Sequence, residues 1–214
     1  MPPPNKPLAE KEVVTDYAWQ GEDDPDRLDT ATIIFGPGRL SAHGTSRTHS
    51  YALSWALETG DNWITRSLTA TVHGHGWSRQ LELERSEDGA WTSRAEASGE
   101  ISLPPPGIIT ATADLSDALD CDLGLCPMTN TMPIRRLKLL APSASGEETE
   151  LTMAWVDVPS LRVFPSKQRY GSSGAAAHAV RFSSEDGNFT AELTTDQHGV
   201  VTRYPGLARL LPSS

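Results

Sequence analysis

Residues 51–91 read YALSWALETGDNWITRSLTATVHGHGWSRQLELERSEDGAW, and this stretch decides the fold class. Over residues 51–58, large apolar side chains occupy every second position, from Tyr51 to Leu57. The same alternation covers residues 63–72, where Arg66 is the single charged residue on the apolar face, and residues 78–85. A two-residue period is typical of half-buried strands, and the glycines between these segments favour hairpin turns. The stretch therefore predicts a meander of at least four antiparallel strands, the last at residues 90–95.

The second half of the chain predicts another set of strands, at residues 134–140, 151–158, 177–183, 188–196 and 199–204. Helix signals are few. We expect one short helical turn within residues 159–170 and another within residues 205–211, which begin at a proline. About ten antiparallel strands in two halves, divided near residues 100–120, predict an all-β fold. The expected form is a single highly curved antiparallel sheet that makes a half-open barrel or wrap, with one or two short helices.

The length of 214 residues suits one large β domain. Residues 1–12, which are rich in proline, are expected to form a flexible N-terminal arm, and residues 13–214 a single β-wrap domain. Residues 104–106 and 141–150 are expected to be linkers within that domain.

Charge and cysteine content limit the classes of partner and the compartment. The chain has 18 basic and 28 acidic residues, a net charge of −10, so phosphate backbones and anionic lipid surfaces should repel it. No apolar stretch is long enough for a transmembrane helix or a secretory signal. Two cysteines make no disulfide framework. We therefore expect a cytoplasmic protein that binds no nucleic acid and does not insert stably into membranes. The sequence does not indicate an oligomeric state.

A second informative stretch, residues 120–137, reads DCDLGLCPMTNTMPIRRL. On a strand, Asp120 and Asp122 would share one face. They could serve as an acid and base pair, grip the hydroxyls of a sugar, or form ion pairs. Arg135 and Arg136 would then alternate between faces, and an inward arginine needs a carboxylate partner, because an unpaired buried charge costs several kcal/mol. An Asp–Arg network is expected in each case.

Four other residues have two interpretations each. Asn130, which lies between two threonines, can hold a turn or offer hydrogen bonds to a glycan. Arg66 can extend its charged end to the rim of the apolar face or bind an anionic head group. Trp63 and Trp77 lie near turns, so they can line a cavity mouth and stack on a sugar, although most tryptophans of β domains are core residues.

Signals for catalysis and metal binding are weak. His73 and His75 have the spacing of two ligands on one strand face, but no third ligand is near them in sequence. No serine has the surroundings of a nucleophile elbow, and neither cysteine has a partner close in sequence. We predict no catalytic residue, no metal and no cofactor.

The stretch at residues 120–137 resembles the hallmark of the bacterial putative glycolipid-binding family, D-x-D-L-G-x-x-P-x-T-N-T-x-P-I-R-R-L. The similarity extends from about residue 14 to the C-terminus and includes residues 63–66, 81–91, 168–170 and 196–205. Cys126, Met128 and Met132 depart from the residue types usual for the family.

The resemblance implies a spiderroll-like all-β wrap, similar in shape to periplasmic lipoprotein carriers, around an apolar cavity. It further implies non-enzymatic binding of an amphiphile, a glycolipid, with a polar rim of Asp, Asn and Arg side chains. The residues expected to bind the ligand are Trp63, Arg66, Trp77, Asp120, Asp122, Asn130, Arg135, Arg136, Arg169 and Tyr170. The alternative is a hydrolase of carbohydrates or amphiphiles, with Asp120 and Asp122 as its acid and base.

Overall fold

The computed structural model describes residues 12–109, 114–144, 146–174, 178–184 and 189–212. Its strands are β1 (Val13–Gly21), β2 (Leu28–Gly36), β3 (Arg39–Arg47), β4 (Tyr51–Thr59), β5 (Thr65–Gly74), β6 (Trp77–Arg85), β7 (Trp91–Gly99), β8 (Gly107–Ile108), β9 (Asp120–Leu123), β10 (Glu148–Val156), β11 (Arg162–Ser172), β12 (Ala179–Ser184), β13 (Phe189–Thr195), β14 (Val201–Tyr204) and β15 (Ala208–Leu210). The helical elements are η1 (Asp61–Trp63), η2 (Pro127–Asn130) and α1 (Thr131–Arg136).

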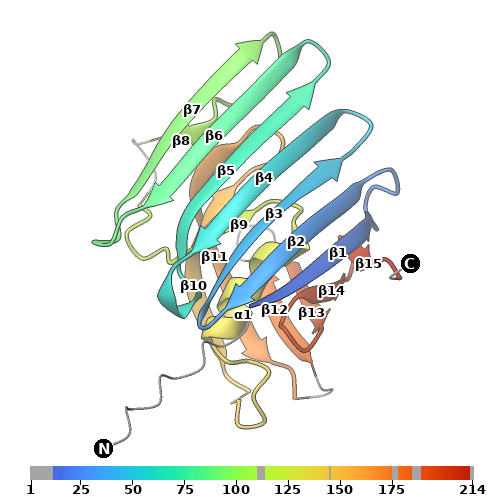
Figure 1. Cartoon of the computed structure of the whole chain (residues 1–214), viewed down its shortest axis with the longest axis vertical. Coiled ribbons are helices and arrows are strands. Elements are labelled where there is room, and N and C mark those ends of the chain that lie inside the picture. The colour runs from blue at the N-terminus through green and yellow to red at the C-terminus, as the bar shows by residue number, and fades with distance from the viewer. Residues whose placement is uncertain (1–11, 110–113, 145, 175–177, 185–188, 213–214) are drawn as a thin grey trace, which may run out of the picture.

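All strands belong to one sheet with the order β7-β6-β5-β4-β3-β2-β1-β15-β14-β13-β12-β11-β10-β9, and β8 pairs with β11. Strands β1 to β7 form one antiparallel meander, strands β10 to β15 form another, and β1 joins them by pairing with β15. The two parallel pairs are β9 with β10 and β8 with β11. Strands β7 and β9 lie at opposite ends of this order, so the curved sheet is open (Figure 1).

The predicted meander is confirmed. In β4 the side chains of Leu53, Trp55 and Leu57 are buried, and their neighbours along the strand are exposed. The register places Leu68 of β5 opposite Leu83 of β6, and both are fully buried. The period of two in the sequence therefore marks the face of the sheet that the protein covers.

Three local predictions are wrong. Residues 134–140, expected to be a strand, contribute instead to α1, because Pro133 fits the first helical turn, where backbone N–H groups have no helical partner. Residues 159–170, expected to hold a helical turn, lie mostly in β11. The buried positions of β11 include Ser166 and Gln168, so the face that points inward is polar and the hydropathy pattern is hidden. Residues 205–211 form a turn and the short strand β15.

The segment 120–137 fills the interior of the wrap. Leu123, Met128 and Met132 are fully buried in the main core cluster. Thr65 of β5 ties this segment to the N-terminal meander, since its hydroxyl accepts a hydrogen bond from the backbone N–H of Cys121 at 3.0 Å and lies 3.5 Å from the sulfur of Met132. Side chains of the chain itself, in the described part, thus occupy the central space between the two meanders.

The predicted arm, residues 1–12, falls almost wholly outside the described residues, as do residues 185–187 between two of the predicted strands. None of the helices described here has the length and apolar character needed to cross a membrane.

Candidate functional site

The two aspartates of the hallmark lie on β9 and are buried, with exposed fractions of 1% for Asp120 and 7% for Asp122. Asp120 faces Arg136 of α1. The Nη1 atom of Arg136 donates to Oδ1 of Asp120 at 2.6 Å, and its Nη2 atom donates to Oδ2. Burial raises the pKa of Asp120 and the guanidinium opposes the rise. Because arginine does not lose its proton, a neutral Asp120 would leave a buried cation unpaired, and the carboxylate therefore stays ionised at neutral pH.

Asp122 has neutral partners. Its Oδ1 atom accepts from the hydroxyl of Thr129 at 2.6 Å, and its Oδ2 atom accepts from the side-chain amide of Gln168 at 2.6 Å. Burial raises the pKa of Asp122 to about 6, and the two hydrogen bonds oppose this rise without cancelling it. The prediction of an Asp–Arg network thus describes Asp120 and leaves Asp122 in a network of a different kind.

Tyr170 and Asn130 continue this network. The Tyr170 hydroxyl lies 2.9 Å from the side-chain oxygens of both Asn130 and Gln168. Asn130 and Tyr170 are both buried, and Asn130 also holds the short helical segment η2, since its side-chain amide donates to the backbone oxygen of Pro127 at 3.3 Å. Asp122, Gln168, Asn130 and Tyr170 therefore share one internal polar cluster, which holds β9, η2 and β11 together beside the Asp120–Arg136 pair and offers no open surface to a ligand.

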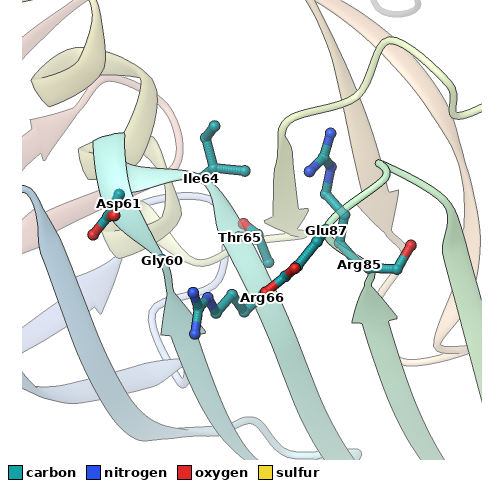
Figure 2. A pocket seen from close by; sticks show the side chains of 8 residues that line it. Gly60, Asp61, Ile64, Thr65, Arg66, Arg85 and Glu87 are labelled. Carbon is teal, nitrogen blue, oxygen red and sulfur yellow. The ribbon is translucent and has the colours of Figure 1, made fainter.

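Arg66 lies in a separate groove of about 360 Å³ beside η1 (Figure 2). The guanidinium groups of Arg66 and Arg85 point in different directions in this groove, and Arg85 donates to the backbone oxygen of Ala118 at 3.0 Å. Asp61 and Glu87 also line it, so its charge is mixed. Arg66 is exposed, as the interpretation of a side chain that extends to the rim requires.

Trp77 and Arg169 lie apart from the other predicted site residues. Trp77 begins β6 at the far end of β5 from η1, and its ring packs over Gly74 and near Arg79. Arg169 is on the exposed side of β11, where its guanidinium contacts Glu150 at 2.8 Å. The structure therefore does not bring either residue to the internal polar cluster or to η1.

Trp63 and Arg135 come together at one end of the wrap. The guanidinium carbon of Arg135 lies 4.8 Å from the centre of the Trp63 ring. Both line a cleft of about 500 Å³, which we call the end cleft. Its lining residues are Gly38, Trp63, Ile134, Arg135, Lys138, Leu140, Ala141, His178 and Gln197. They come from the β2–β3 turn, from η1, from α1 and the residues that follow it, from the residue before β12, and from the β13–β14 turn.

The end cleft differs in charge from four other large clefts in the described part of the chain. Arg135 and Lys138 line it, and no carboxylate does. Each of these four clefts includes a pair of carboxylate residues: Asp61 and Glu87, Asp16 and Asp196, Glu82 and Glu96, and Asp117 and Glu150. In a chain with ten more acidic than basic residues, a cleft without acids is a distinctive local feature.

Lys138, His178 and Gln197 were not predicted as site residues. Lys138 follows the paired arginines closely, so its position next to Arg135 was a usable signal. His178 precedes β12 and Gln197 lies in the turn between β13 and β14, and both reach the end cleft only through the topology of the sheet.

The largest of the described clefts, about 860 Å³, lies at the seam between β1 and β15. Its lining residue Asp196 accepts from the Tyr17 hydroxyl at 2.6 Å and from the backbone N–H groups of His198 and Val200. These contacts engage both oxygens of the carboxylate, so Asp196 works here as the anchor of a turn.

The described residues contain no group of three or more His, Cys, Asp or Glu side chains placed to hold a metal ion. His73 is exposed near the end of β5, and His75 lies in the exposed turn that follows this strand. Cys121 and Cys126 are free thiols, and burial raises the pKa of each well above the usual range for cysteine, which disfavours the reactive thiolate.

A family model described as "Putative glycolipid-binding" matches residues 16–210. The chain is also similar to the crystal structure of a DUF1089 family protein from Pseudomonas aeruginosa, with a TM-score of 0.59, 26% sequence identity, and 97% of each chain covered. No protein with a curated description matches the sequence.

Proposed function

The chain belongs to the Putative glycolipid-binding family, and on that premise we propose that it binds the head group of a glycolipid in the end cleft without catalysing a reaction. The observation that carries the proposal is the meeting of Trp63 and Arg135 in one cleft. Its volume of about 500 Å³ lies within the range of about 300–1,000 Å³ that is typical of small-molecule sites. The cytoplasmic location stays a prediction from the sequence.

The position of the lipid tail follows from the packing of the interior. Met128, Met132 and Ile134 are fully buried where the predicted apolar cavity would be. A tail could enter only by displacing them, and each buried side chain of this size contributes about 1.5–3 kcal/mol through burial. We therefore place the head group in the end cleft and the tail outside the wrap. Leu140 and Ala141, which line the cleft and are partly exposed, give the first methylene groups an apolar contact.

The head group would meet hydrogen-bonding groups rather than a bare aromatic ring. Trp63 is only 7% exposed, and one face of its ring is covered by the Arg135 guanidinium. In this arrangement the tryptophan holds the arginine, and the N–H groups of Arg135 and the side-chain amide of Gln197 can bond the hydroxyls of a sugar. This is a different role for Trp63 from the sugar stacking predicted above.

The alternative of a hydrolase needs two accessible carboxyl groups on either side of the reacting bond. Asp120 is enclosed by Arg136, and Asp122 is enclosed by Thr129 and Gln168. The geometry therefore favours a structural role for both aspartates, and we propose no catalytic function for them.

The test is flotation of the purified protein with vesicles that contain monoglucosyl diacylglycerol, an uncharged glycolipid. Gln197→Trp would fill the mouth of the end cleft from an exposed turn, and His75→Trp adds the same ring at the opposite end of β5. Binding that Gln197→Trp abolishes and His75→Trp preserves would support the proposal. Binding that is absent, or that Gln197→Trp leaves intact, would show that the end cleft is not the site.

A further inference from the structure

We infer that the end cleft is a site for a phosphate group, with Arg135 and Lys138 as its cationic ligands. The inference rests on the proposed function for the location of the ligand and adds the chemical class of the head group: a phosphate ester in place of an uncharged sugar alone. It concerns a local feature, since the chain as a whole has a net charge of −10.

The two cations of the end cleft, Arg135 and Lys138, have no acidic partner in the part of the chain that the structure describes. Throughout the described residues, neither Arg135 nor Lys138 has a carboxylate within ion-pair distance, a property that they share with other cations such as the exposed Arg47. No carboxylate lines the cleft in which the two cations lie. A pair of uncompensated positive charges in a concave site concentrates the field there and attracts anions despite the negative charge of the molecule.

Trp63 and Gly199 hold the Arg135 side chain in place. Its guanidinium carbon lies 4.8 Å from the centre of the Trp63 ring, and its N–H groups donate to no other described residue, so they are available to a ligand. Gly199 makes room for the arginine stem, because a Cβ atom on Gly199 would lie 3.2 Å from Cδ of Arg135. The side chain is thus held before a ligand arrives, which reduces the entropy lost on binding.

The backbone of Lys138 has a conformation that is usual for glycine. Leu139 N–H bonds to the oxygen of Ile134 and Lys138 N–H bonds to that of Arg135, which is the Schellman arrangement that ends a helix. Lys138 occupies the left-handed position of this motif, with φ of 53°, where glycine is the usual residue. Local stability would favour glycine here, whereas lysine adds a cation to the lining of the end cleft.

The arrangement of hydrogen-bond donors around the end cleft favours phosphate over other anions. Donors reach the cleft from three segments: the end of α1, His178 before β12, and Gln197 between β13 and β14. A tetrahedral phosphate has acceptor oxygens in several directions, and arginine forms strong charge-assisted bonds with it. The cleft volume of about 500 Å³ leaves room for the group to which the phosphate is attached.

A purely structural role makes a different prediction. If Lys138 only balanced the negative end of α1, and Arg135 only covered Trp63, their replacement would change stability and leave ligand binding unaffected. The two explanations separate when binding is measured with variants that fold.

The test uses three probes: inorganic phosphate by titration calorimetry, and flotation with vesicles of phosphatidylcholine containing either phosphatidylglycerol or uncharged monoglucosyl diacylglycerol. The variants are Arg135→Gln and Lys138→Gly, and the glycine suits the left-handed backbone. Arg47→Gln removes the same charge from an exposed position at the opposite end of β3 from Gly38. We expect Arg135→Gln and Lys138→Gly to weaken phosphate binding about tenfold or more, and Arg47→Gln to have little effect.

The outcomes separate the two proposals. Phosphate binding that both cleft variants weaken supports the inference, and stronger flotation with phosphatidylglycerol identifies the lipid as its source. Binding of free phosphate without such flotation supports the site and points to a soluble phosphate ester. Binding of the uncharged glycolipid without binding of inorganic phosphate or of phosphatidylglycerol overturns the inference and leaves the proposed function standing. If phosphate binds and the uncharged glycolipid does not, the proposed function falls and the phosphate site remains.

Discussion

Arg136 forms a bidentate ion pair with Asp120, in which Nη1 donates to Oδ1 at 2.6 Å and Nη2 donates to Oδ2. The pair joins α1 to β9 in the middle of the wrap, with exposed side-chain fractions of 7% for the arginine and 1% for the aspartate. Because the ion pair is bidentate and buried, each charge has a partner at a site that is largely closed to water. The paired arginines of the hallmark thus have separate roles, since Arg136 joins α1 to β9 in the interior and Arg135 lines the end cleft.

Breaking this pair should destabilise the protein strongly. Asp120→Asn leaves the Arg136 charge buried without a carboxylate, and we expect the free energy of unfolding to fall by about 3–5 kcal/mol. Urea denaturation followed by tryptophan fluorescence measures this change. The control is Glu82→Gln, which removes an exposed carboxylate 4.0 Å from Arg94 and should cost no more than about 1 kcal/mol. Equal losses in the two variants would show that the buried pair is not important for stability.

Asp122 should make stability depend on pH. Burial raises the pKa of Asp122 in the folded protein to about 6 from its ordinary value of 3.8. Between these values the folded state binds more protons than the unfolded state, so stability falls as the pH rises through this window. Above pH 6 the cost of the buried charge is about 3 kcal/mol by the usual conversion of pKa to free energy.

Replacement by asparagine tests this prediction. Asp122→Asn removes the buried charge, so we expect it to unfold at higher urea concentration than the wild type at pH 8, and to lose most of that advantage at pH 4. Asp26→Asn, at an exposed turn, controls for the change in net charge. A difference between Asp122→Asn and wild type that stays constant from pH 4 to pH 8 would contradict the assignment.

Much of the fold could be read from hydropathy, and the failures have physical causes. The strands from residue 51 to 95 were predictable because their inner faces are apolar and their outer faces polar. The inner face of β11 includes Gln168 and Tyr170, which serve the internal polar cluster, so a search for apolar alternation could not find this strand. β3, with Gly44 and His43 at its centre, was missed for the same lack of large apolar residues.

The site was harder to predict because it depends on which segments meet. The hallmark pointed to the right segment, but it could not show that Asp122 and Asn130 face the interior while Arg135 faces a cleft. One misassigned element explains this, because treating residues 134–140 as a strand placed the two arginines on opposite faces of a sheet. On α1 they point to the internal partner Asp120 and to Trp63.

Gly44 should be sensitive to the smallest enlargement. A Cβ atom there would lie 2.0 Å from the backbone oxygen of Thr30 and 2.5 Å from the ring of Trp55. Overpacking of this kind costs about 1–3 kcal/mol, and we expect Gly44→Ala to lower the free energy of unfolding by at least that amount. Gly146→Ala, where only the end of the Arg181 side chain comes within 4 Å, is the control. Thermal melting with matched stabilities of the two variants would refute the close approach.

Lys138→Gly should raise stability while it weakens phosphate binding. The left-handed backbone at Lys138, with φ of 53°, is strained for lysine and natural for glycine. Replacement by glycine at the end of a helix should therefore stabilise the protein by up to about 1 kcal/mol, after the greater flexibility of glycine in the unfolded chain is taken into account. Lys138→Ala provides the comparison, because it removes the same charge but keeps the strain, and it should be less stable than Lys138→Gly. Urea denaturation of the two variants measures the backbone effect, and phosphate titration of both measures the charge effect. If the glycine variant is the less stable of the two, the lysine backbone is not strained, and the conformation of Lys138 no longer supports a phosphate site.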